Sequence, residues 1–147
     1  MRLKTKLLLV LSILAGMILS LGTYFLVSHQ QTNDAYQALL EKEDYRVLLK
    51  AIQFRLTGMS NDERAYLIQG DPEFIKEIGN KTSDIEKYIS QIQQIKGIGP
   101  EELQATEKIS RNFSLYTAAS QKVADAYGRG DAASAVKLHF GEARDAR

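Results

Sequence analysis

The pattern of apolar and polar positions divides the chain into two unlike parts. Residues 7–27 hold 16 hydrophobic side chains among 21 positions and carry no charge. As a helix this run spans about 30 Å, which matches the hydrocarbon core of a bilayer. After it, apolar residues recur every three, four or seven positions between short breaks that contain glycine. Such spacing is typical of helices with one buried face, so the pattern predicts an all-α protein with a transmembrane helix and a helical domain outside the membrane.

The apolar periodicity predicts three long helices, and the first of them begins within the membrane run. The first continues from the membrane to Gln69, because no proline interrupts it, and its inward positions are Ala38, Tyr45, Ile52, Met59 and Tyr66, with Leu49 and Leu56 in a second register. The second covers 72–96, with inward Ile75, Ile78, Ile85, Ile89 and Ile92. The third covers 100–127, with inward Ile109, Phe113, Tyr116, Ser120, Val123 and Tyr127.

The breaks between these helices carry start and stop signals. In Gly70-Asp71-Pro72-Glu73, Gly70 suits a left-handed C′ position, Asp71 an N-cap and Pro72 the first helical position. Gly130 and Asp131 repeat the signal before a fourth helix over 131–147, for which the expected inward residues are Ala133, Val136, Phe140 and Ala143.

The predicted helix lengths indicate an incomplete domain. The third helix rises about 42 Å, whereas residues 131–147 cover only about 25 Å. We therefore expect an up-down-up-down four-helix bundle whose fourth helix is truncated, and a chain that is a fragment of a longer receptor.

Charge sets the expected orientation. The net charge of +1 is the sum of +3 from Arg2, Lys4 and Lys6 and −2 from residues 28–147, which hold 16 basic and 18 acidic side chains. The positive-inside rule then makes 1–6 a cytoplasmic tail, 7–27 the transmembrane helix and 28–147 an extracytoplasmic domain of a cell-membrane protein. A cleaved signal peptide begins in the same way, but its apolar region is usually about 7–15 residues long and ends in an A-x-A-like site, which is lacking here.

Several functional classes find no support in the sequence. There is no cysteine, and the only histidines are His29, expected at the membrane interface, and His139, expected to be partly exposed. We find no GxGxxG motif, P-loop or nucleophile elbow, so we expect no enzyme, no cofactor and no metal site. Charges of both signs alternate along the helix faces, which argues against nucleic-acid binding.

Two groups of residues are candidates for binding. Ser12, Gly16 and Ser20 recur every four residues in the apolar run, a spacing that lets two transmembrane helices pack closely as a dimer. Near the end of the first helix, Glu63 falls in the register of Leu49 and Leu56, which points a charge into the bundle or into a dimer seam. Two interpretations stay open: a paired or exposed surface cluster, or a ligand site in which Arg55 or Arg64 pairs with an anionic small molecule.

The stretch from Asp62 to Phe74, DERAYLIQGDPEF, resembles the first-hairpin signature of the four-helix-bundle sensor domains of bacterial methyl-accepting chemotaxis proteins. It is also similar to the E-R-x-Y-L-x-x-G-D-P-E stretch in sensor domains of some histidine kinases. The resemblance implies a homodimeric membrane receptor that senses a small molecule or a ligand-loaded solute-binding protein. It also implies coupling to CheA and CheW through a cytoplasmic region beyond these residues. Arginines near the distal dimer interface hold the ligand in aspartate and serine receptors, and Arg55 and Arg64 lie at a comparable height.

Two other functions remain possible at this point. The first keeps the sensor but joins it to a histidine kinase. The second is a single-span structural or adaptor protein with a helical bundle and no ligand. Both share the expected fold, so the choice between them depends on sites and on family.

Overall fold

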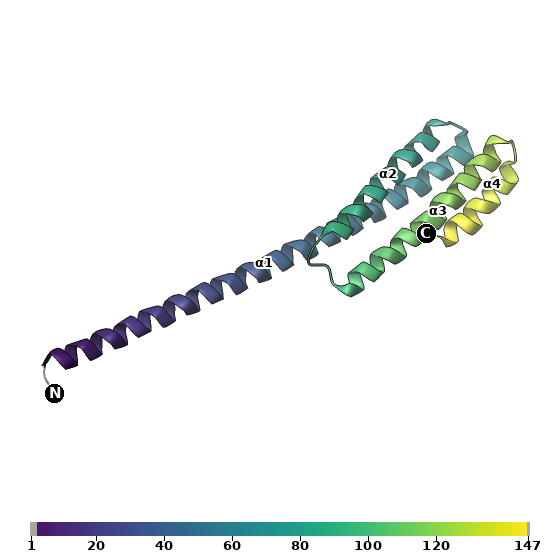
Figure 1. The fold of residues 1–147 in the computed structure, drawn as a ribbon. Coiled ribbons are helices and arrows are strands. Elements are labelled where there is room, and N and C mark those ends of the chain that lie inside the picture. The colour runs from purple at the N-terminus through teal and green to yellow at the C-terminus, as the bar shows by residue number, and fades with distance from the viewer. Residues whose placement is uncertain (1–2, 147) are drawn as a thin grey trace. The chain divides into compact units, whose positions relative to one another are not determined.

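The computed structural model describes residues 3–146, with the backbone alone for Thr5; Met1 and Arg2 of the predicted tail, and Arg147, lie outside the described residues. It is 92% helical with no strand in that range, which confirms the all-α prediction. The helices are α1 (Leu3–Gln69), α2 (Glu73–Gln94), α3 (Pro100–Gly128) and α4 (Ala132–Leu138). A π-helical turn, η1 (His139–Ala143), continues α4 (Figure 1).

The chain forms two units, one up to Leu40 and one from Glu41, and α1 contributes to both. In the first unit the apolar run is exposed along its length, and none of its most hydrophobic window is buried. A core helix of a soluble protein would hide these side chains. One long apolar helix near the N-terminus, with its side chains exposed, fits a membrane protein.

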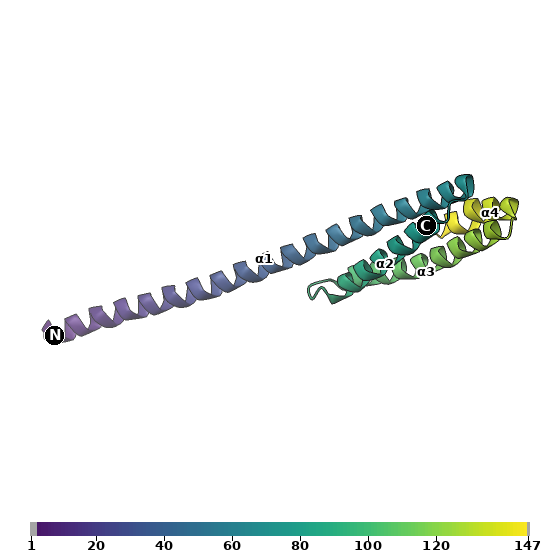
Figure 2. The same cartoon turned by 90° about the horizontal axis from the view of Figure 1, so that it is seen from above.

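In the second unit the end of α1, α2, α3 and α4 lie side by side, each antiparallel to the one before it (Figures 1 and 2). This is the predicted up-down-up-down bundle. The breaks follow the sequence signals: Gly70 and Gly130 adopt positive φ of 70° and 85°. The Asp71 carboxylate accepts from the Glu73 amide at 2.9 Å, and that of Asp131 accepts from the Ser134 amide at 3.0 Å.

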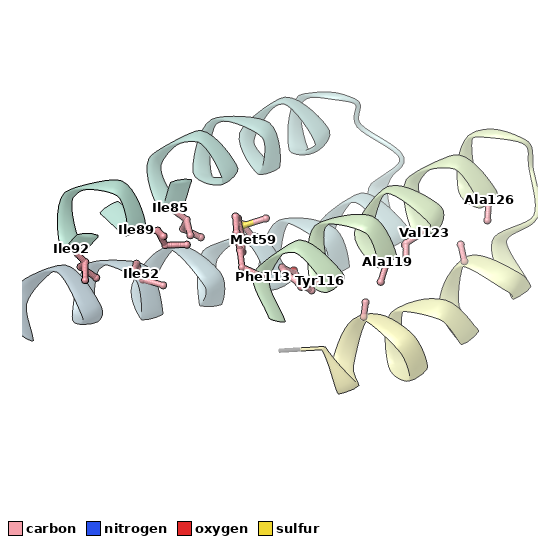
Figure 3. Packing of buried hydrophobic residues seen from close by; sticks show 12 residues of the cluster. Ile52, Met59, Ile85, Ile89, Ile92, Phe113, Tyr116, Ala119, Val123 and Ala126 are labelled. Atoms are coloured by element: carbon pink, nitrogen blue, oxygen red, sulfur yellow. The ribbon is translucent and has the colours of Figure 1, made fainter. Parts of the chain in front are cut away.

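The core contains large side chains where α1, α2 and α3 meet and small ones where α4 packs (Figure 3). The large members are Ile52, Met59, Ile85, Ile89, Ile92, Phe113 and Tyr116, all at predicted inward positions. Facing α4, α3 presents Ala119, Val123 and Ala126. Ala135 of α4 and Ala143 of η1 are buried as well. Because alanine is small, α4 and η1 approach α3 closely, and this contact fixes the position of His139.

The predicted inward face of the last helix is wrong at three positions. Ala133 is exposed, Val136 is 43% exposed and Phe140 is 57% exposed. Ala143 is buried as predicted, but the other buried residues are Ala135 and His139. Because the last helix packs closely against α3, it turns the face with the small Ala135 and Ala143 inward, and the face with Val136 and Phe140 stays outside. The π-helical turn contributes as well, because its wider turn keeps residues four apart more nearly in line than an α-helix does.

An ion-pair cluster joins α1 to α2. Lys81 lies 2.8 Å from the Asp62 carboxylate and 3.1 Å from that of Glu77. Partial burial by itself lowers the pKa of Lys81, but its hydrogen bonds to these two carboxylates outweigh burial and hold the pKa above its ordinary value of 10.5. Asp62 is therefore a paired residue at the edge of the bundle.

Two glycines of the second unit should respond oppositely to alanine. Gly70→Ala should lower the free energy of unfolding by about 1–2 kcal/mol, because φ of 70° disfavours any side chain and the new Cβ would lie 3.3 Å from the Tyr127 hydroxyl. Gly79→Ala, in the middle of α2 with open space around it, should raise it by about 0.5–1 kcal/mol. Hydrogen exchange of the full chain in lipid nanodiscs measures both, and equal effects of the same sign would contradict the backbone assignment.

The start of α4 should depend on pH through Asp131. Hydrogen bonds from the Ser134 hydroxyl and amide lower the pKa of Asp131 below its ordinary value of 3.8. A lowered folded-state pKa means that the cap stabilises the helix above the unfolded-state value and is lost as pH falls through the folded-state value. Protection of the α4 amides should therefore fall on acidification below about pH 3.8.

Asp131→Asn is the matched control for this prediction, because asparagine also caps a helix but does not titrate. Its α4 amides should keep the same protection across that pH range. Equal pH dependence in both proteins would mean that another carboxylate controls the end of the bundle.

Candidate functional site

A buried carboxylate lies in the half of the bundle near the turn between α1 and α2. Glu63 projects from α1 into the core, in the register predicted for it, and is 1% exposed. Its Oε2 accepts a hydrogen bond from the Ser120 hydroxyl of α3 at 2.8 Å and lies 3.5 Å from the Tyr116 hydroxyl. Its Oε1 lies 2.6 Å from Nδ1 of His139 in η1. One side chain thus connects α1, α3 and η1.

The hydrogen bonds assign the tautomer of His139. The Nε of Arg64 lies 3.4 Å from His139 Nε2, and a guanidinium can only donate. Nε2 is therefore the acceptor, and Nδ1 carries the proton that it donates to Glu63. The prediction that His139 is partly exposed is wrong, because the side chain is 1% exposed and contacts Glu63 rather than water. A buried carboxylate requires donors, and His139 supplies one of them.

A groove of about 340 Å³ runs between α2 and α3. Met59 of α1 lines it as well, and Ser120, which donates to Glu63, belongs to its α3 side. The groove does not include Glu63 or His139. The carboxylate–imidazole pair is therefore shielded from any molecule in the groove, and only Ser120 belongs to both features.

The profile of the CHASE3 domain matches residues 35–142. The chain belongs to the CHASE3 domain family. CHASE3 is an extracellular sensor domain found in chemotaxis receptors and in histidine kinase receptors. No curated protein matches the chain, and no solved structure matches it. The expected sensor fragment is thus confirmed as a sensor domain of a class shared by both kinds of receptor.

Arg55 and Arg64, the two arginines predicted to bind a ligand, do not form one site in the CHASE3 bundle. Arg55 Nε pairs with Asp84 of α2 at 2.9 Å, whereas Arg64 contacts His139 of η1. Nine residues separate them, which is about 900° of helical rotation, so they lie on opposite sides of α1. A single small anion within one chain cannot contact both guanidinium groups.

The small residues of the apolar run, Ser12, Gly16 and Ser20, lie before the matched CHASE3 region. The two serine hydroxyls donate to the backbone carbonyls of Leu9 and Met17 of their own helix at 2.9 Å. A Cβ on Gly16 would meet no atom within 4 Å. This face is open for a second helix, and its role in dimer packing stays a prediction.

His139 is the site residue that the sequence analysis missed. Apolar periodicity placed Val136 and Phe140 inward and thereby turned His139 outward. A usable signal existed: Glu63 was expected to point inward and would need a donor, and His139 lies four residues before the inward Ala143.

Among residues 3–146, no group of three or more histidine, aspartate or glutamate side chains is arranged to hold a metal ion.

Joint removal of Glu63 and His139 should cost far less stability than the sum of the two separate removals. Glu63→Leu or His139→Leu should each lower the free energy of unfolding by about 3–5 kcal/mol, because each leaves a buried polar partner unpaired. The double variant should lose much less than the sum, because it leaves neither group of the pair behind. Hydrogen exchange of the α3 and η1 amides in nanodiscs measures the coupling.

Lys122→Ala is the control for this double-mutant cycle. Lys122 of α3 pairs with Glu142 of η1 at 2.6 Å, so this pair also ties η1 to the bundle, but both of its side chains are more than half exposed. Its loss should cost less than about 1 kcal/mol. Additive effects of Glu63→Leu and His139→Leu would show that the pair does not act as a unit.

Proposed function

We propose that the chain is the transmembrane sensor module of a chemoreceptor. The CHASE3 bundle detects an extracytoplasmic small molecule, or a ligand-loaded solute-binding protein, and the membrane helix transmits the signal to a chemotaxis kinase pathway. One observation carries the proposal: α1 is a single helix from Leu3 to Gln69 that includes both the exposed apolar run and the buried Glu63 of the sensor domain. A change at the carboxylate therefore acts on the element that enters the membrane.

The proposed orientation places the N-terminus in the cytoplasm. Lys4 and Lys6 precede the apolar run, together with Arg2 of the sequence, and no further basic residue follows it until Lys42. The CHASE3 match begins after the run, at residue 35, which agrees with an extracytoplasmic sensor.

The proposed assembly is a homodimer. On the side of α1 opposite the buried Ile52 and Met59, Val47, Phe54, Asn61 and Ile68 recur at heptad spacing and form a stripe that we call the α1 seam. The three apolar members are 54–81% exposed, and Asn61 is exposed as well. Apolar residues at this spacing, with one asparagine in the seam, are the signature of a paired helix whose register is fixed by the polar residue. A second copy of the chain is the occupant that offers the same stripe.

The proposed mechanism needs only a small displacement. A ligand that binds one packing of the bundle better than another shifts the population toward that packing. Glu63 holds α1 to α3 and to η1, so a change in this packing alters the position of α1. Displacements of about 1–2 Å at helix interfaces are sufficient in known switches.

We assign no chemical reaction to these residues. His139 and Glu63 have the composition of an acid–base pair, but each is 1% exposed and neither lines the groove. A general base must reach its substrate proton within about 3.2 Å. The pair therefore supports a structural role.

The output partner is proposed as CheA, with CheW, acting on a cytoplasmic region beyond the described chain. A histidine kinase output is the second candidate, because CHASE3 occurs in both receptor classes. Purified full-length receptor should regulate phosphorylation of added CheA in the presence of CheW. Phosphorylation of the receptor itself, without CheA, would favour the kinase.

Cysteine substitution tests the orientation and the dimer, since the sequence contains no cysteine. In intact cells a membrane-impermeant maleimide should label Asp34→Cys and leave Lys4→Cys unlabelled. Under mild oxidation Val47→Cys and Phe54→Cys should form disulfide-linked dimers, as should Gly16→Cys within the membrane.

Ser83→Cys, at an exposed position on α2 away from the seam, is the control and should stay monomeric under the same oxidation. If only Lys4→Cys were labelled, the orientation in the membrane would be the opposite of the proposed one. Equal cross-linking of Ser83→Cys and Phe54→Cys would contradict the α1 seam.

A further inference from the structure

The groove between α2 and α3 has a composition suited to a small molecule. Its volume of about 340 Å³ lies at the lower end of the range of ligand sites. Met59, Ile75 and Ile78 give it an apolar side, and Gly79 leaves open space at its α2 edge. No charged side chain lines it. The occupant is therefore small and partly apolar.

The three hydroxyl groups of the groove have already used their hydrogen-bond donors. Thr82 donates to the Ile78 carbonyl at 2.9 Å, and Thr117 donates to the Ser114 carbonyl at 3.0 Å. The Ser120 hydroxyl donates to Glu63 at 2.8 Å. Each of these three oxygens keeps lone pairs, so the groove offers acceptors.

Gln121 adds a further acceptor to the same wall. Its side-chain Nε2 donates one N–H to Asp125 at 2.8 Å, which leaves the amide oxygen and the second N–H of the same group. Acceptors therefore outnumber donors on this surface, and a ligand that presents several donors matches it better than one that presents only acceptors.

We infer that this groove binds a neutral, hydrogen-bond-donating small molecule with an apolar side, such as a vicinal diol on an aromatic or alkyl group. An anion would face mostly acceptors, with the Glu63 carboxylate hydrogen-bonded to Ser120. A cation would give up its hydration in a groove with no carboxylate on its lining to pair with it. A neutral donor avoids both costs.

Ser120 connects the groove to the buried cluster. Ser120 lines the groove, and its hydroxyl donates to Glu63, whose other oxygen accepts from His139 of η1. A donor from the ligand to Ser120 therefore acts at one end of a hydrogen-bonded chain through α3, α1 and η1. This inference rests on the proposed sensor function and names the class of ligand.

Methyl NMR of the full chain in nanodiscs tests the inference, because the sequence has three methionines and only Met59 lies at the groove. The probe is 1-phenyl-1,2-ethanediol at millimolar concentration. It should shift the Met59 methyl resonance saturably and leave that of Met17 unchanged. Its dimethyl ether, which has the same apolar group and no donor, should leave both resonances unchanged.

Variants locate the site. Gly79→Leu should abolish the Met59 response while the bundle stays folded, because the new side chain enters open space. Thr117→Val should weaken binding of the diol several-fold, up to about tenfold, which corresponds to one lost hydrogen bond. Thr57→Val, which removes a hydroxyl with the same kind of backbone hydrogen bond outside this groove, is the control and should leave the affinity unchanged.

Specific outcomes would overturn the inference. Equal binding of the dimethyl ether, or tighter binding of 2-amino-1-phenylethanol or of mandelate, would show that the ligand class is wrong. An unchanged Met59 resonance with all four compounds, or a full response in Gly79→Leu, would remove the groove as the site.

Disulfide formation of Gly16→Cys separates this inference from the proposed function. If an added compound changes the cross-linking rate without affecting Met59, the sensor function stands and the groove proposal fails. If the diol shifts Met59 and leaves the cross-linking rate unchanged, the groove is a binding site and the proposed transmission across the membrane fails.

Discussion

The second unit depends on the hydrogen bonding of one buried carboxylate. Glu63 would be strongly destabilising in an apolar core, because an unpaired buried charge costs several kcal/mol. It is tolerated because donors from two other elements, Ser120 of α3 and His139 of η1, meet its two oxygens. The same requirement fixes how α1, α3 and the last helix pack. If α1 moved relative to α3 and η1, the hydrogen bonds to both oxygens of Glu63 would break together. This favours a small number of discrete packings.

The CHASE3 bundle combines this polar cluster with two different kinds of apolar contact. Isoleucine, methionine and aromatic side chains fill the space between α1, α2 and α3, whereas alanines bring α4 and η1 close to α3. The groove between α2 and α3 lies where neither kind of packing fills the surface, and Ser120 joins it to the cluster. The proposed ligand groove and the stabilising cluster therefore use adjacent parts of one helix interface.

The sequence predicted most of the fold and part of the site. Helix boundaries, the caps at Asp71 and Asp131, and the inward isoleucines follow from local patterns that need no tertiary information. The inward register of Glu63 was also readable. Its partner was not: His139 lies 76 positions away in the chain, and the periodicity of the last helix favoured Phe140, which is 57% exposed. Arg55 and Arg64, the two alternatives for a ligand-binding arginine, lie on opposite sides of α1, and a role of either in binding stays a prediction.

The sequence by itself determined that the chain is all-α, that its first helix carries a membrane-length apolar run, and that Glu63 shares the register of apolar positions that face the bundle or a dimer seam. These follow from the period of the helix and from local hydrogen bonding, both of which act over a few residues. Only the tertiary structure decided which face of the last helix is buried, which donors satisfy Glu63, and where the groove lies. Those choices arise when close packing and the satisfaction of a buried charge must hold together across helices distant in sequence.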